Sequence, residues 1–190
     1  MILTYDLHSC LQAQAYRSLL SIARFHGWSF DTSRPKATVV ADLAEQLNAL
    51  VKQGLDLVAL DTEEQTALRA LLHAGGQLAQ AEFIYRFGEY RPYRPWREDA
   101  PDAPWTQPRS PTEQLLYRGL IFPLNLGTVE RPVHVFALPT EYREPLRELL
   151  DVDLQAIPLA QDDETTLLQH LFAFLSYLNC AAVKPRHPGC

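Results

Sequence analysis

The side chains that most often carry out chemistry are scattered along this chain. Its three cysteines, Cys10, Cys180 and Cys190, form no CxxC pair and lie near no ordered set of histidines, so the sequence predicts no zinc site. There is no Gly-x-Ser-x-Gly, HExxH or phosphate-loop motif. The six histidines are spread from His8 to His187. We therefore expect a non-catalytic protein without a metal or other cofactor.

The class of protein follows from the composition. An odd and sparse set of cysteines is typical of reduced thiols in the cytoplasm. No apolar run approaches the roughly 18 residues that a membrane span needs, so we expect no membrane partner. The acidic run Asp162-Asp163-Glu164 resembles a metal cluster, but carboxylates in the first turn of a helix also stabilise its dipole, which is the interpretation we favour.

Charge bears most directly on whether the partner is a nucleic acid. The net charge is −6, whereas nucleic-acid binders usually carry a basic surface. The basic residues are nevertheless concentrated locally, in an aromatic and arginine-rich segment. Its members are Tyr85, Arg86, Tyr90, Arg91, Tyr93, Arg94, Trp96 and Arg97. This composition either stacks the bases of a single strand or fastens a proline-rich loop to the protein surface.

The periodicity of apolar residues predicts a mainly α fold with one small antiparallel β-hairpin. The hairpin is expected over 120–138, where two short apolar runs flank Gly127. A proline-rich insertion, 90–109, interrupts the pattern. Helices are expected at 11–26, 36–50, 61–73, 78–87, 111–119, 140–150 and 162–180.

The order of elements over 61–138, three helices and then a hairpin, is that of a winged helix, whose third helix enters the DNA major groove. That helix would be 111–119, with Thr112, Gln114 and Arg118 pointing outward. Glutamine can pair with adenine, and arginine with guanine or phosphate. The same side chains on a short surface helix are otherwise simply solvated.

The first hairpin, LLSIARFHGW followed by KATVVADLAEQL, resembles the SAP motif. That resemblance implies DNA binding through Arg34 and Lys36, at the start of the second helix. Together with HAGGQLAQAEFIYRFGEYRPYRPW and SPTEQLLYRGLIFPL, it resembles the N-terminal domain family of XPB-type helicases and related bacterial proteins. No helicase motif is present, so the resemblance implies an accessory module without the motor.

We therefore expect three parts: a SAP-like hairpin (1–56), a winged-helix-like domain (57–150) and an apolar C-terminal helix with its tail (151–190). The favoured function is DNA binding in an accessory role. Its expected nucleic-acid-binding residues are Arg34, Lys36, Arg91, Arg94, Arg109, Gln114 and Arg118.

The alternative function is a protein-interaction module, able to form homodimers, in which the winged helix no longer binds DNA. The last helix is apolar on more than one face, which indicates a buried helix or a docking surface. Its expected partner-binding residues are Leu168, Phe172 and Leu175.

Overall fold

The computed structural model describes residues 5–54, 59–91, 103–128 and 130–150. The chain divides into two compact units, Met1–Leu154 and Gln155–Cys190, and all described residues belong to the first. The predicted helix over 162–180, with Leu168, Phe172 and Leu175, therefore lies outside the described residues, as does Arg94.

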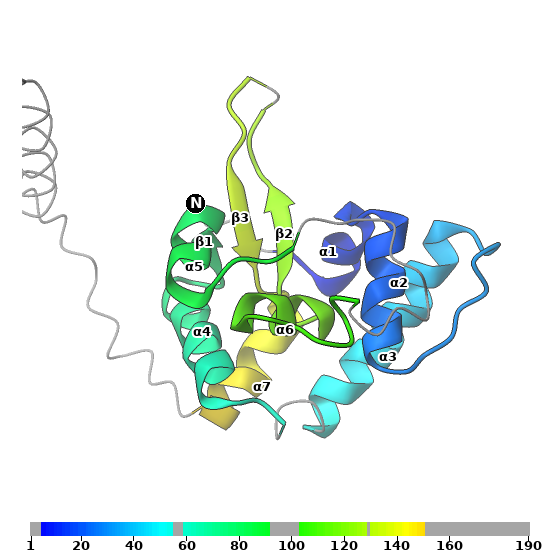
Figure 1. The fold of residues 1–190 in the computed structure, drawn as a ribbon, viewed down its shortest axis with the longest axis horizontal. Coiled ribbons are helices and arrows are strands. Elements are labelled where there is room, and N and C mark those ends of the chain that lie inside the picture. Colours follow the sequence, from blue (N-terminus) through cyan, green and yellow to red (C-terminus); the bar gives the residue numbers. More distant parts are fainter. Residues whose placement is uncertain (1–4, 55–58, 92–102, 129, 151–190) are drawn as a thin grey trace, which may run out of the picture. The chain divides into compact units, whose positions relative to one another are not determined.

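The described part is mainly helical with a small antiparallel sheet, as the sequence predicts (Figure 1). Its helices are α1 (Leu7–Ala13), α2 (Tyr16–Phe25), α3 (Lys36–Gln53), α4 (Thr62–His73), α5 (Gln80–Phe87), α6 (Pro111–Tyr117) and α7 (Thr140–Leu150). Its strands are β1 (Gln77–Ala79), β2 (Phe122–Asn125) and β3 (His134–Ala137). No helix among the described residues is long and apolar enough to cross a bilayer.

Two predicted elements differ from the structure. The single helix expected over 11–26 is two helices, because the backbone is extended at Gln14, and the Gln14 side chain donates hydrogen bonds to the carbonyls of Cys10 and Pro123. The helix expected over 78–87 begins only at Gln80, because the three residues before it form β1.

The three strands form one sheet in the order β1-β3-β2, and both pairings are antiparallel. In the register, Leu78 lies opposite Phe136, and Leu124 lies opposite Val135. The predicted β2–β3 hairpin is confirmed, and its outer part projects from the body (Figure 1). The side chain of Asn125 shapes the turn, because its Oδ1 atom accepts hydrogen bonds from the backbone N–H groups of Gly127 and Val133.

One hydrophobic core connects the N-terminal helices to the sheet and α7. It joins residues of α1, α2 and α3, such as Leu11, Ile22 and Leu43, with residues of the sheet and α7, such as Phe136 and Leu146. The described part of the predicted first domain, residues 5–54, therefore shares a core with the segment that follows it. As a result α2 lies against α6, and α3 lies against α7.

Candidate nucleic-acid interface

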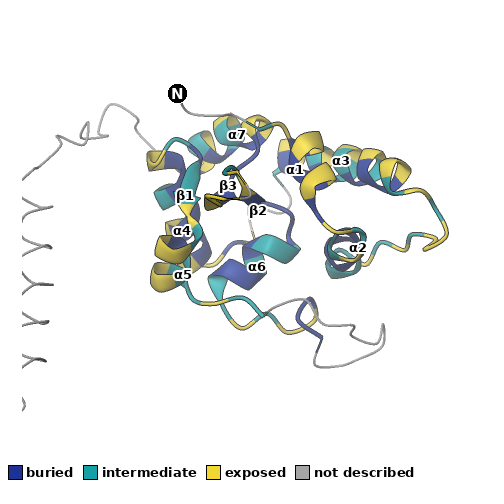
Figure 2. Cartoon of the chain, turned by 90° about the horizontal axis from the view of Figure 1, so that it is seen from above, coloured by how far each residue is buried: buried dark blue, intermediate teal, exposed yellow. Residues whose placement is uncertain are grey.

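Helix α6 is the element that the winged-helix interpretation assigns to the DNA groove. It begins where the Ser110 side chain accepts a hydrogen bond from the backbone N–H of Glu113, and proline occupies its first turn. Every residue of α6 is buried or half-buried, and in Figure 2 the α6 ribbon is dark blue and teal, whereas α4 and α5 have yellow outer faces.

The outward orientation predicted for Thr112 and Arg118 is wrong. Thr112 is 0% exposed and Arg118 is 8% exposed. The side chain of Thr112 donates a hydrogen bond to the Phe87 carbonyl at the end of α5. Gln114 is half-buried and is the only one of the three that retains partial access to solvent. The helix is covered because α2 packs on one side of it while α4 and α5 pack on others.

Arg118 forms a buried ion pair with Glu64 of α4. Its Nε atom lies 3.1 Å from Oε1 of Glu64, and its Nη2 atom donates to the Ala59 carbonyl at 3.1 Å. Oε2 of the same carboxylate accepts the Asp61 N–H, which completes the capping box of α4. Burial raises the pKa of Glu64, and this effect outweighs the opposing hydrogen bond from Asp61 and the charge of Arg118. The pair joins the start of α4 to the end of α6.

Arg91 is held by a second buried carboxylate, that of Glu113. The Nε and Nη2 atoms of Arg91 each lie 2.8 Å from an oxygen of Glu113, in a bidentate pair. The backbone N–H groups of Arg91 and Arg109 also donate to this carboxylate. Burial by itself would raise the pKa of Glu113, but the hydrogen bonds from Arg91 and Arg109 outweigh it and hold the pKa below its usual value. Arg91 thus fastens the segment after α5 to α6.

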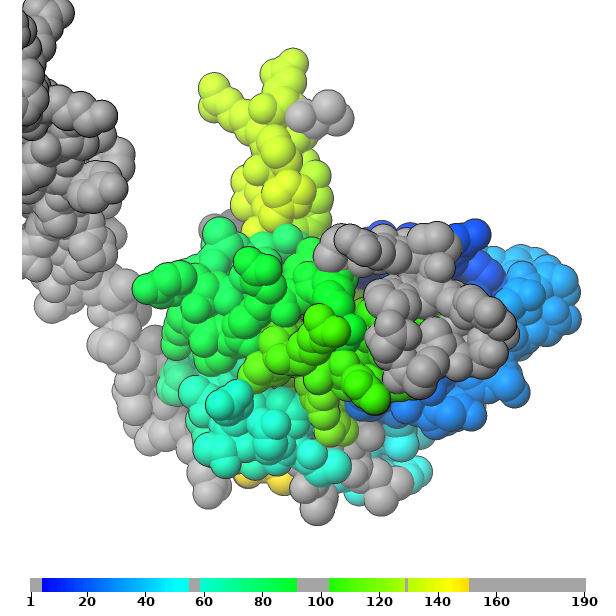
Figure 3. All heavy atoms as spheres, in the orientation of Figure 1, coloured from blue at the N-terminus to red at the C-terminus, as the bar shows by residue number. Residues whose placement is uncertain are grey.

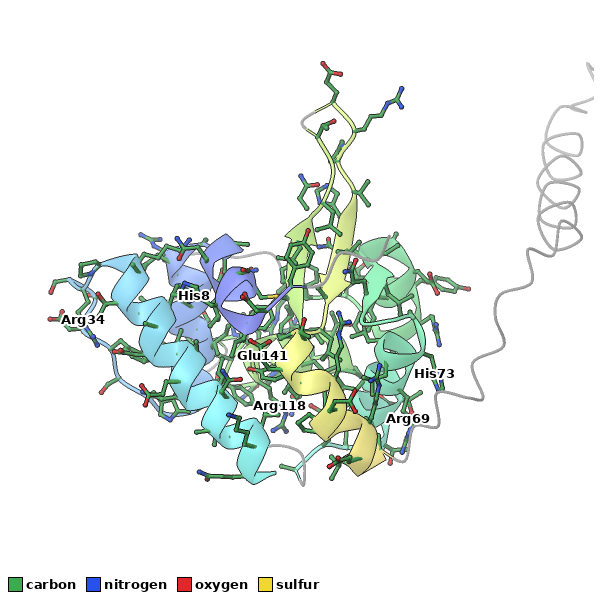
Figure 4. All side chains as sticks on the ribbon, turned by 180° about the vertical axis from the view of Figure 1, so that it is seen from behind. His8, Arg34, Arg69, His73, Arg118 and Glu141 are labelled. Atoms are coloured by element: carbon green, nitrogen blue, oxygen red, sulfur yellow. The ribbon has the colours of Figure 1, made fainter. Side chains whose placement is uncertain are left out.

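The two cations that the SAP resemblance assigns to DNA binding, Arg34 and Lys36, also have partners within the protein. Nη1 of Arg34 lies 2.7 Å from Oδ2 of Asp42, the seventh residue of α3. Nζ of Lys36 donates to the Gln12 carbonyl at the end of α1, at 2.6 Å. Figure 4 shows Arg34 at the far end of the molecule from α4, whereas Arg118 lies in its interior. The described members of the predicted nucleic-acid-binding set therefore do not form one continuous basic face.

Among the members of the predicted set that the structure describes, Arg109 is the exposed one. It lies in a groove of about 480 Å³ between the start of α4 and the end of α5. The groove is lined by Thr62, Glu63, Thr66, Arg86, Phe87, Gly88, Arg109, Ser110 and Pro111. A second depression of about 200 Å³ shares Arg109 with it and reaches Gln114. The acidic residues Asp61 and Glu63 also line these depressions, so their walls are of mixed charge.

Sequence reasoning missed a larger hollow of about 630 Å³ beside the loop after α2. Its aromatic walls include Trp28, Phe30 and Trp105. Trp28 stacks on the His26 ring with centroids 4.4 Å apart, and the guanidinium of Arg24 lies 5.4 Å from the centre of the Trp105 ring. Loop aromatics far apart in the sequence have no periodicity that would have predicted this grouping.

No group of three or more metal-ligating side chains is found among the described residues. His26 illustrates why, because its Nε2 atom lies 3.0 Å from the Arg118 carbonyl oxygen and its ring is stacked on Trp28. These contacts fix the histidine as a packing residue between α2 and the end of α6.

Comparison of the chain with protein families, with curated proteins and with solved structures finds no significant match. The interpretation of the site therefore depends on its geometry.

Proposed function

We propose that this chain is a non-catalytic protein-interaction module, built on a winged-helix arrangement that does not read DNA through its third helix. The observation that carries the proposal is the burial of α6. A recognition helix presents about three or four side chains to base edges. In α6, Thr112, Glu113 and Leu115 are at most 1% exposed.

The topology supports the winged-helix part of the proposal. The elements α4, β1, α5, α6, β2 and β3 follow one another in the order helix, strand, helix, helix and two-stranded wing, and β1 closes the sheet by pairing with β3. This order is the one expected of a winged helix, in which the wing projects beside the third helix. In the proposed arrangement, the hairpin between β2 and β3 corresponds to that wing.

The SAP-like hairpin has a packing role in this proposal. Helices α2 and α3 with their connecting loop keep the proposed SAP-like order, and Lys36 begins the second of them. DNA binding through this hairpin would require Arg34 and Lys36 to exchange Asp42 and the Gln12 carbonyl for phosphate oxygens. Because α2 instead packs on α6, we infer that the hairpin covers the helix that would otherwise enter the groove.

The wing is the surface that best suits a protein partner. Figure 3 shows it standing clear of the rest of the molecule as a narrow column of atoms. Val133 on this column is 52% exposed. The wing also carries Glu130 and Arg131, both exposed, so its tip has no excess of positive charge for a phosphate backbone. An accessory module related to helicases would use such a surface to dock onto a larger protein.

The test is a fluorescence-anisotropy titration of the full chain against duplex and single-stranded DNA at about 50 and about 200 mM salt. We expect no saturable binding at either salt concentration. The proposal would be overturned by DNA binding that weakens steeply with salt and is reduced in Arg109→Gln. In that case the wing variant Val133→Ser should bind DNA as the wild type does. Light scattering after gel filtration, with Leu168→Asp as the variant, tests whether the partner is a second copy of the chain.

A further inference from the structure

Helices α4 and α7 pack against each other, and each carries two basic side chains four residues apart. Arg69 and His73 lie on α4, and Arg143 and Arg147 lie on α7; we call these four residues the basic seam. Figure 4 shows α7 alongside α4, with Arg69 and His73 on the α4 side. The helices run in opposite directions, because Nε of Arg69 donates to the Leu150 carbonyl at the end of α7, while Arg143, near its start, lies against the turn after α4.

Two arginines of the basic seam have donors without acceptors. Nε and Nη2 of Arg143 and Nε of Arg147 are buried, and none has a hydrogen-bond acceptor among the described residues. The Arg143 guanidinium lies directly over Gly76, where a Cβ atom would stand only 2.6 Å from it. Buried donors are nearly always satisfied in native proteins, so donors of this kind indicate a place where another acceptor belongs.

The positive charges of Arg143 and Arg147 lie close to each other. Burial lowers the pKa of Arg143, and the neighbouring charge of Arg147 lowers it further. Of the two carboxylates in the first turns of α7, Glu141 accepts the Leu7 N–H with both of its oxygens, and Glu144 is paired with Arg147. Arg147 therefore has a carboxylate partner, whereas the buried charge of Arg143 has another cation as its neighbour, an arrangement that costs free energy.

We propose that the basic seam binds a carboxylate from an acidic segment of the partner protein, an inference that rests on the proposed function. The planar fork of arginine matches the two oxygens of a carboxylate. A half-buried site favours a single charge, because the desolvation penalty of an ion increases with its charge.

The experiment is an isothermal titration of the full chain with hexaglutamate peptide, with hexaglutamine as the neutral control. We expect hexaglutamate alone to bind, and Arg143→Gln and Arg147→Gln each to weaken binding at least about tenfold, because a charged hydrogen bond contributes roughly 1.5–3 kcal/mol. The matched control is Arg86→Gln, which removes an exposed arginine of α5. Absence of hexaglutamate binding, or equal affinity in all three variants, overturns the inference.

A stability measurement separates a binding role from a structural one. A cation near the end of α4 could serve only to stabilise the helix dipole, in which case Arg143→Met lowers the melting temperature. A binding site assembled from unsatisfied donors predicts that Arg143→Met melts at the wild-type temperature or above it, and a clear decrease overturns the inference. DNA binding would refute the proposed function, whereas failure of hexaglutamate with no DNA binding refutes only the carboxylate site.

Discussion

The buried ion pair between Glu64 and Arg118 makes a sharp prediction about stability. The side chain of Glu64 is 1% exposed and that of Arg118 is 9% exposed, and the two come from different helices. The substitution Glu64→Gln removes the negative charge but keeps the shape and an oxygen that can accept the Asp61 N–H. It therefore tests the charge of the pair with little change in packing.

The magnitude follows from what Arg118 retains in the variant. Removing one partner of a buried pair usually costs about 3–5 kcal/mol, because the other charge remains buried without compensation. Arg118 would still donate to the Ala59 carbonyl and would still lie over the Phe25 ring, 5.5 Å from its centre. Because burial raises the pKa of Glu64, the substitution also removes a desolvation penalty, so we expect a loss below that range, of about 2 kcal/mol in the free energy of unfolding.

The assay is urea unfolding of the full chain, followed by tryptophan fluorescence. Its matched control is Glu82→Gln, which removes the carboxylate of an exposed pair with Arg86 and should cost less than about 1 kcal/mol. The double variant Glu64→Gln with Arg118→Met should recover much of the loss, because it removes both buried charges. A loss in Glu64→Gln no larger than in the control, or strict additivity in the double variant, would refute the reasoning.

Three further predictions concern α6, its C-terminal glycine and the wing. Hydrogen bonds from Arg91 hold the pKa of Glu113 below its usual value against the effect of burial, so the stability that the Glu113 carboxylate contributes is complete above the unfolded-state pKa and is lost as the pH falls through the folded-state pKa. The difference in the free energy of unfolding between wild type and Glu113→Gln, measured by urea unfolding, should therefore shrink on acidification. A difference that stays constant with pH would contradict this. Gly119 has a φ of +72° and a Cβ there would lie 2.9 Å from Leu47, so Gly119→Ala should lower the free energy of unfolding by about 1–3 kcal/mol; an unchanged denaturation midpoint would argue against the strain. Asn125→Ala should speed hydrogen exchange at the tip of the wing while the melting temperature stays close to wild type, since the side chain of Asn125 organises only exposed backbone.

Much of the secondary structure follows from the sequence alone. The N-terminal ends of α4 and α6 follow from local sequence. Asp61 and Ser110 each stand three residues before a glutamate, Glu64 and Glu113, and cap the helix by accepting a hydrogen bond from the backbone N–H of that glutamate. Two neighbouring apolar runs of the sequence likewise predict the β2–β3 hairpin. Such elements depend on hydrogen bonds between residues close in sequence, so a local pattern is enough to predict them.

Other features depend on contacts between residues far apart in the sequence, which local sequence patterns do not contain. Strand β1 has only three residues and exists because it pairs with β3, more than fifty positions later. The break at Gln14 depends on a carbonyl of β2. Arg118 was expected on a solvated face because charged residues are costly to bury, yet it is buried because Glu64, 54 positions earlier, provides its counter-charge. That pairing depends on how α4 and α6 pack, and it determines which face of the predicted recognition helix is available to a partner.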